Sequence, residues 1–280
     1  MAYIKTKEEI KQILKGGKIL GSILEKLAKA VRPGVSTLEI DQLAEKLIKK
    51  AGGKPAFKGY KGRKSDPPFP TTICACVNEE LVHGIARADQ KLKNGDVFSI
   101  DIGMEYPSPK FIKSDGGRGY FTDTAITVIV GDGSTALTTS VPEKTRELMR
   151  VTREALEVGI GAAKPGNTVA DIGRAIEQYV KSQGNYGIVR DLVGHGVGHA
   201  VHEEPRVPNY YDKDMEKWVL EPGVVIAIEP MIAIGHHAIE TAEDGWTVRM
   251  KDKSLCAHFE HTVIITEDGN KVATRRPAEL

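Results

Sequence analysis

The sequence lacks an excess of charge of either sign. Its 280 residues contain 39 Lys and Arg against 38 Asp and Glu, which leaves a formal net charge of +1. General nucleic-acid binders and proteins of anionic membranes usually carry a clear basic excess, and disordered charged tails are lopsided in charge. The balance argues against these classes, so we expect no specific nucleic-acid partner.

Cysteine is also scarce. Only Cys74, Cys76 and Cys256 occur, and an odd, sparse count does not make a disulfide framework, which favours a reducing compartment. The Cys-x-Cys pair at 74–76 could bind a metal or undergo redox chemistry. That interpretation is disfavoured, because no second Cys or His pair stands at zinc-like spacing around it.

Long apolar runs are missing as well. No stretch approaches the roughly 18 apolar residues that a membrane helix needs. The first residues, MAYIKTKEEIKQ, become charged before any apolar run develops, so they are not typical of a signal peptide. With 40% hydrophobic and 28% charged residues, the chain can still bury a core. We expect a cytoplasmic, monomeric protein with no membrane contact.

Helix and strand signals follow one another in a regular order. A Ser or Thr that stands three residues before an acid predicts capping boxes, and hence helix starts, at Thr6, Ser36 and Thr168. Pro142 suits the first turn of a further helix. Strand-like runs are expected at 72–77, 97–102, 120–130, 224–228 and 262–266.

This order of features occurs twice along the chain. Pro33-Gly34 and Pro165-Gly166 mark corresponding points, and the acids that follow also correspond, Asp101 with Glu229 and Asp123 with Glu260. We infer a duplicated helix–helix–strand unit with a pseudo-twofold axis. Residues 1–280 would then form a single catalytic domain, with halves at about 1–140 and 141–280. Chance similarity between two segments of the same class is the alternative.

The four corresponding acids end or begin apolar runs, FSID, VIAIE, DTAITVIV and EHTVIIT. A carboxylate within a buried run is costly unless it is paired or bound to a metal. A single such acid would more commonly be a surface residue at a strand end, but four related by internal symmetry fit that interpretation less well. If they converge, their repulsion would recruit cations, and carboxylates can bridge two ions about 3.5–4 Å apart. The pattern therefore predicts a dinuclear metal centre.

Histidines cluster in the segment 194–202, GHGVGHAVH. His195 and His199 have the spacing of a helical zinc pair, but the glycines argue against a helix and indicate a tightly turned strand or loop. A phosphate-binding loop is disfavoured, because no Gly-Lys-Ser/Thr follows. Val82-His83 echoes Val201-His202, and such a pair could handle substrate and protons. Taken alone, His83 could equally be a core residue.

Together these motifs resemble those of type I methionine aminopeptidases, in the pita-bread metallopeptidase superfamily, over nearly the whole chain. The segments that carry the resemblance are VNEELVHGI (77–85), SIDIG (99–103), the strand at Asp123, GHGVGHAVHEEPRVPNY (194–210), AIEPM (227–231) and WTVRMKDKSLCAHFEHT (246–262). The resemblance implies an α+β, pita-bread (creatinase/aminopeptidase) fold. In that fold a curved antiparallel sheet is covered by two pseudo-symmetric helix pairs.

The resemblance also implies a metal-ligand set. Asp123 and Glu260 would bridge two divalent ions, Asp101 would chelate one of them, and His195 and Glu229 would hold the other. The donors are compatible with Mn, Fe(II), Co or Zn. Glu229 also matches a proposed proton shuttle.

Substrate contacts are carried over from the same resemblance. His83 and His202 match the histidines that contact the substrate and the tetrahedral intermediate. Cys74, Trp246 and Phe259 are candidates for an apolar methionine pocket. Phe69, Tyr60 and Met231 are weaker candidates, and ordinary core packing is the alternative for each.

The implied activity is hydrolytic removal of the N-terminal methionine from nascent chains and peptides, with a small second residue. An X-prolyl aminopeptidase of the same fold is one alternative, although such enzymes resemble longer chains. A non-catalytic binding protein on this fold is another, although it would be expected to lack ligands. The basic stretch 54–64 could contact ribosomal RNA or be a solvated loop.

Three features depart from the family pattern. The connection 103–119 is longer than usual and is expected to form an extended hairpin near the active-site mouth. It contains Asp115, a rival to Asp123 as a ligand. His199 and His258 stand where the family commonly has other residues, and the resemblance gives neither a role.

Overall fold

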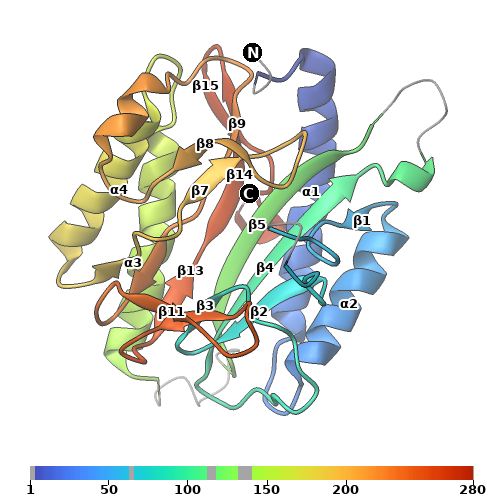
Figure 1. The fold of residues 1–280 in the computed structure, drawn as a ribbon, viewed down its shortest axis with the longest axis vertical. Helices are drawn as coiled ribbons and strands as arrows, with labels where there is room; N and C mark the ends of the chain where they lie inside the picture. Colours follow the sequence, from blue (N-terminus) through green and yellow to red (C-terminus); the bar gives the residue numbers. More distant parts are fainter. Residues whose placement is uncertain (1–3, 63–65, 112–117, 132–140, 280) are drawn as a thin grey trace.

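The computed structural model describes residues 4–62, 66–111, 118–131 and 141–279. Within these ranges four α-helices cover one face of a curved antiparallel sheet, which is the predicted α+β architecture (Figure 1). None of the helices in these ranges has the length and apolar character needed to span a membrane.

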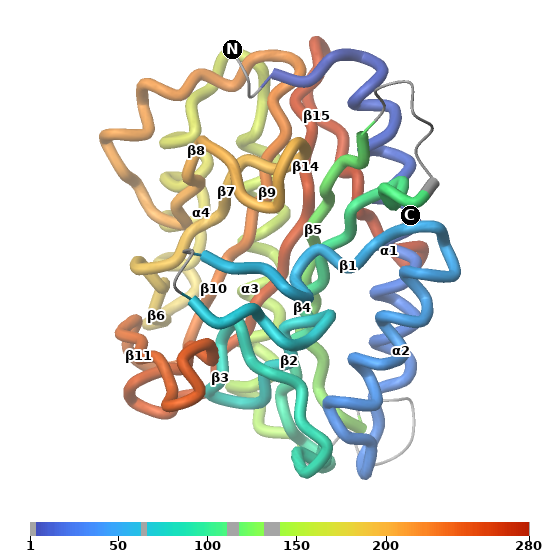
Figure 2. The backbone as a smooth tube through the Cα atoms, turned by 45° about the vertical axis from the view of Figure 1, so that its right-hand side comes forward, coloured from blue at the N-terminus to red at the C-terminus, as the bar shows by residue number. Residues whose placement is uncertain are grey.

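Local capping signals set the helix starts. Thr6 Oγ1 accepts from the N–H of Glu9, and Glu9 Oε2 accepts from the N–H of Thr6 at 2.7 Å; Ser36 and Glu39 make the same reciprocal pair. The predicted capping box at Thr168 is also present. The bounds are α1 Lys7–Ala30, α2 Thr37–Lys50, α3 Glu143–Ala162 and α4 Val169–Gln183. Figure 2 shows α1 and α2 lying together on the right.

The main sheet combines strands from both parts of the chain. Among the described residues its order is β1-β4-β5-β14-β9-β7-β8, with β2 added to β4 and β15 to β14. β5 therefore lies directly beside β14, which comes much later in the sequence. The bounds are β1 Lys54–Pro55, β2 Ile73–Val77, β4 Val97–Tyr106, β5 Tyr120–Ile129, β7 Gly194–Gly196, β8 Glu203–Val207, β9 Val225–Ile228, β14 Glu260–Thr266 and β15 Gly269–Val272.

Two smaller antiparallel sheets complete the strand structure. Their orders are β13-β10-β6 and β11-β12-β3. None of these strands was predicted, because three residues are too few to show an alternating pattern. The bounds are β3 Glu80–Val82, β6 Gly187–Ile188, β10 Met231–Ala233, β11 Ile239–Thr241, β12 Val248–Met250 and β13 Cys256–His258, and the short 3-10 helices are Pro109–Phe111, Lys213–Lys217 and Pro277–Glu279.

The core lies between the sheet and the helices. One apolar cluster joins α1 and α2 to β2 and β4, with Leu24 and Ile100 among its fully buried members. A second joins α3 and α4 to β9 and β14, with Leu156 and Ile226. Each helix thus buries its apolar stripe against the sheet, which leaves the opposite face of the sheet available for a site.

The connection 103–119 begins as the predicted hairpin. β4 and β5 pair without interruption from Val97↔Ile129 to Tyr106↔Tyr120. β4 continues past Ile102, its predicted end, because the cross-strand pairing continues. Residues 112–117, including Asp115, lie outside the described residues.

Candidate metal centre and substrate pocket

Strand register brings three of the predicted acids together. Asp101 on β4 pairs with Ala125 on β5, and Ala125 pairs in turn with Glu260 on β14. Paired residues share a face of the sheet, and so do residues two positions apart on one strand. Asp123 lies two positions before Ala125, so all three carboxylates face the same side across three adjacent strands.

The other part of the chain adds His195 and Glu229 to this face. His195 pairs with Ala227 on β9, and Ala227 pairs with Thr262 on β14. Glu229 stands two positions after Ala227. A Cβ atom on Gly194 would lie 2.4 Å from the Ala227 carbonyl oxygen, so glycine is needed for β7 to approach β9. The predicted tight strand, rather than a helix, is confirmed for residues 194–196.

The side chains of these residues form a group that fits a metal ion. Ligand atoms of Asp123, His195 and Glu260 all lie within 4.8 Å of one another, and His195 Nε2 lies 3.6 Å from Glu229 Oε1. Asp101 Oδ1 and Glu260 Oε1 are buried and have no hydrogen-bond partner among the described residues. Buried carboxylate oxygens without partners are costly, and a divalent cation would satisfy them.

The protonation equilibria of this group are strongly perturbed. Burial raises the pKa of Asp101 to about 6. Burial, and next the charge of Asp101, raise the pKa of Asp123 well above its ordinary value. Burial, and next the charge of Asp123, raise the pKa of Glu260 in the same way. Burial lowers the pKa of His195 to about 4, so its imidazole is neutral at pH 7, the form that ligates metals. Cations would relieve the repulsion among the carboxylates.

Two further histidines flank the group. His83 has φ of +56°, a region that few residues other than glycine adopt and that is found at functional sites. Burial lowers its pKa to about 4. His202 lies at the exposed rim, with its ring centroid 4.4 Å from that of His195 and its Nδ1 2.9 Å from the Tyr60 hydroxyl.

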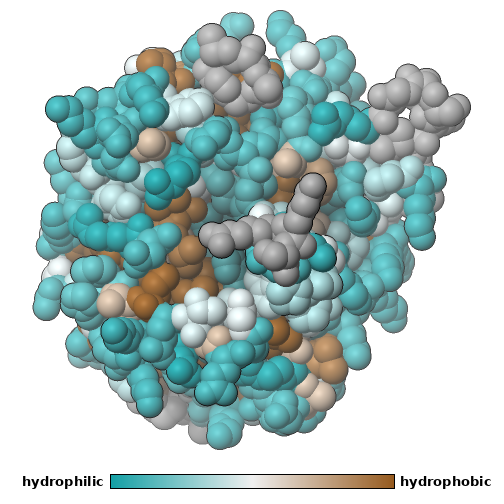
Figure 3. All heavy atoms as spheres, viewed as in Figure 1, coloured by the Kyte–Doolittle hydropathy of each residue, from teal (hydrophilic) through white to brown (hydrophobic). Residues whose placement is uncertain are grey.

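One cavity of about 690 Å³ contains the acids and both flanking histidines. Part of its wall is apolar: Trp246 packs edge to face on Phe69 at 5.3 Å, and Cys74 lies beside them. Burial raises the pKa of the Cys74 thiol well above its ordinary value, so Cys74 lines the cavity as a neutral thiol. Tyr60 and Met231 also line the cavity. Figure 3 shows apolar side chains gathered near the middle of this mostly hydrophilic face.

Phe259 lies elsewhere, which corrects its assignment to the pocket. Its side chain packs in the apolar cluster between the sheet and α3, and it is not among the described residues that line the cavity. Side chains alternate between the two sides of an extended chain. Because His258 and Glu260 face the site, Phe259 must face the helices.

Several site residues carried no usable sequence signal. His258 Nε2 lies 3.3 Å from Glu229 Oε2, and His258 is buried. The sequence marked His258 as unusual but gave it no role. Phe57 and Arg206 also line the cavity, and neither belongs to a motif that points to a site.

Comparisons with known proteins agree with this geometry. The model of metallopeptidase family M24 matches residues 11–267. Methionine aminopeptidase 1 of Bacillus subtilis (strain 168) is 41% identical over 275 residues, 98% of this chain and 100% of that protein. The crystal structure of methionine aminopeptidase from Thermotoga maritima is similar with a TM-score of 0.84 and 38% identity, covering 98% of this chain and 99% of that chain.

A prolidase from Pyrococcus furiosus is a more distant match. Its TM-score is 0.69 and its identity 29%, and the match covers 98% of this chain but 65% of the prolidase. The predicted pita-bread fold is confirmed by these solved structures. From the family match and the full-length relatives, the chain belongs to metallopeptidase family M24.

Proposed function

We propose that this chain is a metal-dependent aminopeptidase that removes the N-terminal methionine from nascent proteins and peptides, with a preference for a small second residue. One observation carries the proposal: a buried Asp/His/Glu group and an apolar pocket share a single cavity. The group suits hydrolysis of an amide bond, and the pocket suits a thioether side chain. The full-length similarity to methionine aminopeptidases supports the same activity.

Five side chains would hold two divalent ions: Asp101, Asp123, His195, Glu229 and Glu260. Asp123 and Glu260 would be the ligands shared by the two ions. Metals bound here would lower the pKa of water and polarise the scissile carbonyl. The oxygen-rich donor set with one imidazole admits Mn, Fe(II), Co or Zn.

The chain's own residues would then handle charge and protons. His83, which burial keeps neutral at pH 7, would hydrogen-bond the substrate without adding charge. His202 would stabilise the oxygen that becomes negative during attack. Glu229, which touches His195 and His258, would carry the proton to the leaving amine.

The apolar wall would select methionine. Cys74 and Trp246, with Phe69 packed against the indole, offer a surface on which a flexible thioether side chain can lie. Sulfur–aromatic contacts are favourable, and an unbranched side chain can lie along the apolar wall. This assigns substrate binding to Cys74 and Trp246, together with His83 and His202.

A metal-restoration assay tests the proposal. The protein is stripped with a chelator, reloaded with single metals, and assayed on peptides that begin Met-Ala, Met-Leu and Ala-Pro. Cleavage of Met-Ala, with little turnover of the others, is expected. Release of Ala from Ala-Pro would support the X-prolyl alternative, for which the prolidase likeness is the observation. No turnover with any metal would support the non-catalytic alternative.

The proposal extends to the setting of the reaction. Nascent chains are made in the cytoplasm, and three buried free cysteines suit a reducing compartment. The proposal keeps the monomer that we expect from the sequence. The basic stretch 54–64 remains our candidate for ribosome contact.

A further inference from the structure

The loop 197–202, between β7 and β8, carries His202, and residues from the hairpin of β4 and β5 hold its first part. The Phe121 N–H donates to the Gly198 carbonyl at 2.8 Å. Arg118 Nη2 donates to the His199 carbonyl at 2.6 Å. Arg118 stands near the end of the connection 103–119 and Phe121 on β5, so the described end of this hairpin contacts the loop that bears the outer histidine.

The first turn of α1 holds the same loop through a side-chain pair. His199 Nε2 lies 2.7 Å from Glu9 Oε1. The other oxygen of Glu9 accepts from the Thr6 N–H, so the capping box of α1 fixes the carboxylate that contacts the loop. Burial alone would raise the pKa of Glu9, but Thr6 and His199 hold it below its usual value, which keeps the carboxylate charged.

The end of the loop is held by an ion pair. Lys5 Nζ lies 2.5 Å from Glu203 Oε2, and the Lys5 side chain is 0% exposed. Glu203 Oε1 accepts from the Ala200 N–H at 2.6 Å. The loop is therefore fixed on both sides of His202, whereas the described residues hydrogen-bond the His202 side chain only through Tyr60.

We propose that Glu9, His199 and Arg118 are positioning residues that set the place of His202 over the reacting carbonyl. This gives a role to His199, for which the family resemblance implies none, and to Arg118 at the end of the connection. A displacement of about 1 Å at a catalytic group can cost on the order of a hundredfold in rate, and an exposed loop does not hold that tolerance by itself. The inference rests on the proposed role of His202 in the peptidase reaction.

A double-mutant cycle tests it. Glu9→Gln keeps the shape of the side chain but removes the charge that meets His199. In the parent enzyme it should lower kcat on a Met-Ala peptide about tenfold and leave KM within about twofold. In a His202→Gln background the same change should leave kcat unaltered, because the group it positions is gone.

Matched variants separate positioning from general damage. Glu8→Gln, the exposed neighbour in the same helical turn, should behave as the parent. Arg118→Met, which has no donor for the His199 carbonyl, should lower kcat as Glu9→Gln does, and Arg118→Lys, which retains a donor, should recover most of the loss. An equal kcat loss for Glu9→Gln in both backgrounds would overturn the inference, and so would parental kcat in Glu9→Gln.

The cycle also distinguishes this inference from the proposed function. Turnover of Met-Ala by the parent enzyme tests the function alone. If the parent cleaves Met-Ala but His202→Gln has the parental kcat, the peptidase assignment stands and the positioning of His202 is overturned. A thermal unfolding midpoint for each variant, expected within a few degrees of the parent, verifies that the comparison is between folded proteins.

Discussion

At the scale of single residues, threonine side chains, and not Lys or Arg, fix the backbone of the two acids proposed to be shared by the ions. Thr262 Oγ1 accepts from the Asp123 N–H at 2.9 Å and donates to the Asp123 carbonyl at 2.8 Å. Thr124 Oγ1 donates to the Glu260 carbonyl at 2.8 Å. No Lys or Arg among the described residues forms an ion pair with either carboxylate. The backbones are fixed while the negative charge is left for a metal.

Removal of any of the proposed metal-binding acids should sharply lower activity. Asp101→Ala and Glu260→Ala are each expected to lower kcat more than about a hundredfold, because even the loss of outer contacts to a metal site costs about 10–100-fold. Bound metal, measured by atomic absorption after dialysis, should fall in parallel. Glu267→Ala, an exposed acid just after β14, is the control. Full activity in either acid variant would contradict the two-metal assignment.

The acids could be predicted from sequence because each interrupts an apolar run, which is a local signal. The contact of Tyr60 with His202 could not, because 142 positions separate the two residues and only the folded loop brings them together. For Phe259 the prediction was wrong. A motif placed it in the pocket, although the alternation of side chains around Glu260 already excluded that.

At the scale of elements, the turns that precede α2 and α4 are held by equivalent hydrogen bonds. The Gly34 N–H donates to the Leu92 carbonyl at 2.8 Å, and the Gly166 N–H donates to the Leu220 carbonyl at 3.0 Å. Both glycines have a left-handed φ, +88° and +87°, which other residues rarely adopt. These equivalent turns support the proposal of a duplicated unit with halves at about 1–140 and 141–280, which stays a prediction.

The capping boxes of these second helices should contribute measurably to stability. Ser36→Ala and Thr168→Ala are each expected to lower the free energy of unfolding by about 1 kcal/mol. The first removes the acceptor of the Glu39 N–H, and the second removes the hydroxyl that donates to Asp171 Oδ2. Urea unfolding followed by circular dichroism measures this. Ser22→Ala, inside α1, is the control and should change stability by less than about 0.5 kcal/mol. A cost no larger than that control would show that the caps contribute little.

The starts of the helices could be predicted from the sequence better than the lengths of the strands. Capping boxes are local patterns, so the starts of α1, α2 and α4 follow from sequence. The length of β4 does not, because its last residues are held by pairing with β5 rather than by an apolar pattern. The short strand β3 forms for the same reason, since its partner β12 lies far along the sequence. β11 and β12 pair with each other locally, but three residues each are too few to show an alternating pattern.

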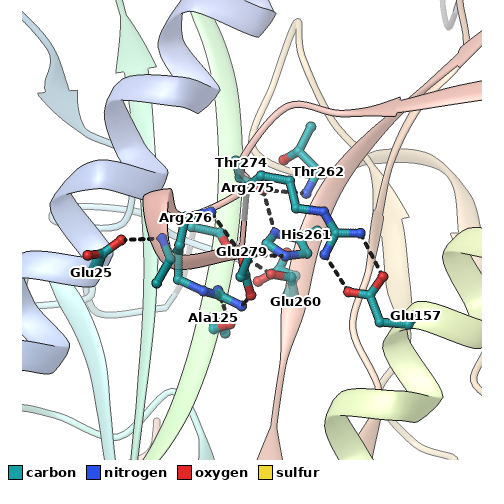
Figure 4. Close-up of polar contacts among 12 residues, drawn as sticks. Glu25, Ala125, Glu157, Glu260, His261, Thr262, Thr274, Arg275, Arg276 and Glu279 are labelled. Carbon is teal, nitrogen blue, oxygen red and sulfur yellow. Dashed lines mark hydrogen bonds and ion pairs between the residues drawn. The ribbon is translucent and has the colours of Figure 1, made fainter.

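At the scale of the whole molecule, the C-terminal segment ties the helices to the middle of the sheet (Figure 4). Arg276, with a side chain 4% exposed, donates through Nη1 to the Ala125 carbonyl at 3.3 Å and pairs with Glu279. Glu279 also lies 3.4 Å from His261 Nε2 on β14. The segment further contacts Glu25 of α1 through Ala278 and Glu157 of α3 through Arg275. Ala125 is the residue that pairs with both Asp101 and Glu260, so this linkage lies directly behind the site.

Acid should break this linkage through Glu279. Burial alone would raise the pKa of its carboxyl, but the contact with His261 and the charge of Arg276 lower that pKa to about 2, against 4.5 ordinarily. Between these values the unfolded chain binds a proton that the folded chain does not, so stability falls as the pH falls. The stabilisation is fully present above pH 4.5 and is lost as the pH approaches 2.

Glu279→Gln tests the sign and the size of this effect. The variant has no carboxyl to titrate, so its free energy of unfolding should depend less on pH than that of the parent between pH 4.5 and 2. The difference accumulated over this range should be on the order of 2 kcal/mol, after allowance for partial exposure of the pair. Urea unfolding at several pH values in this range measures it. Ser22→Ala on α1, which removes no ionisable group, should keep the parental dependence. If Glu279→Gln also kept the parental dependence, the Glu279 side-chain carboxylate would not be the group that links the helices to the strands of the site.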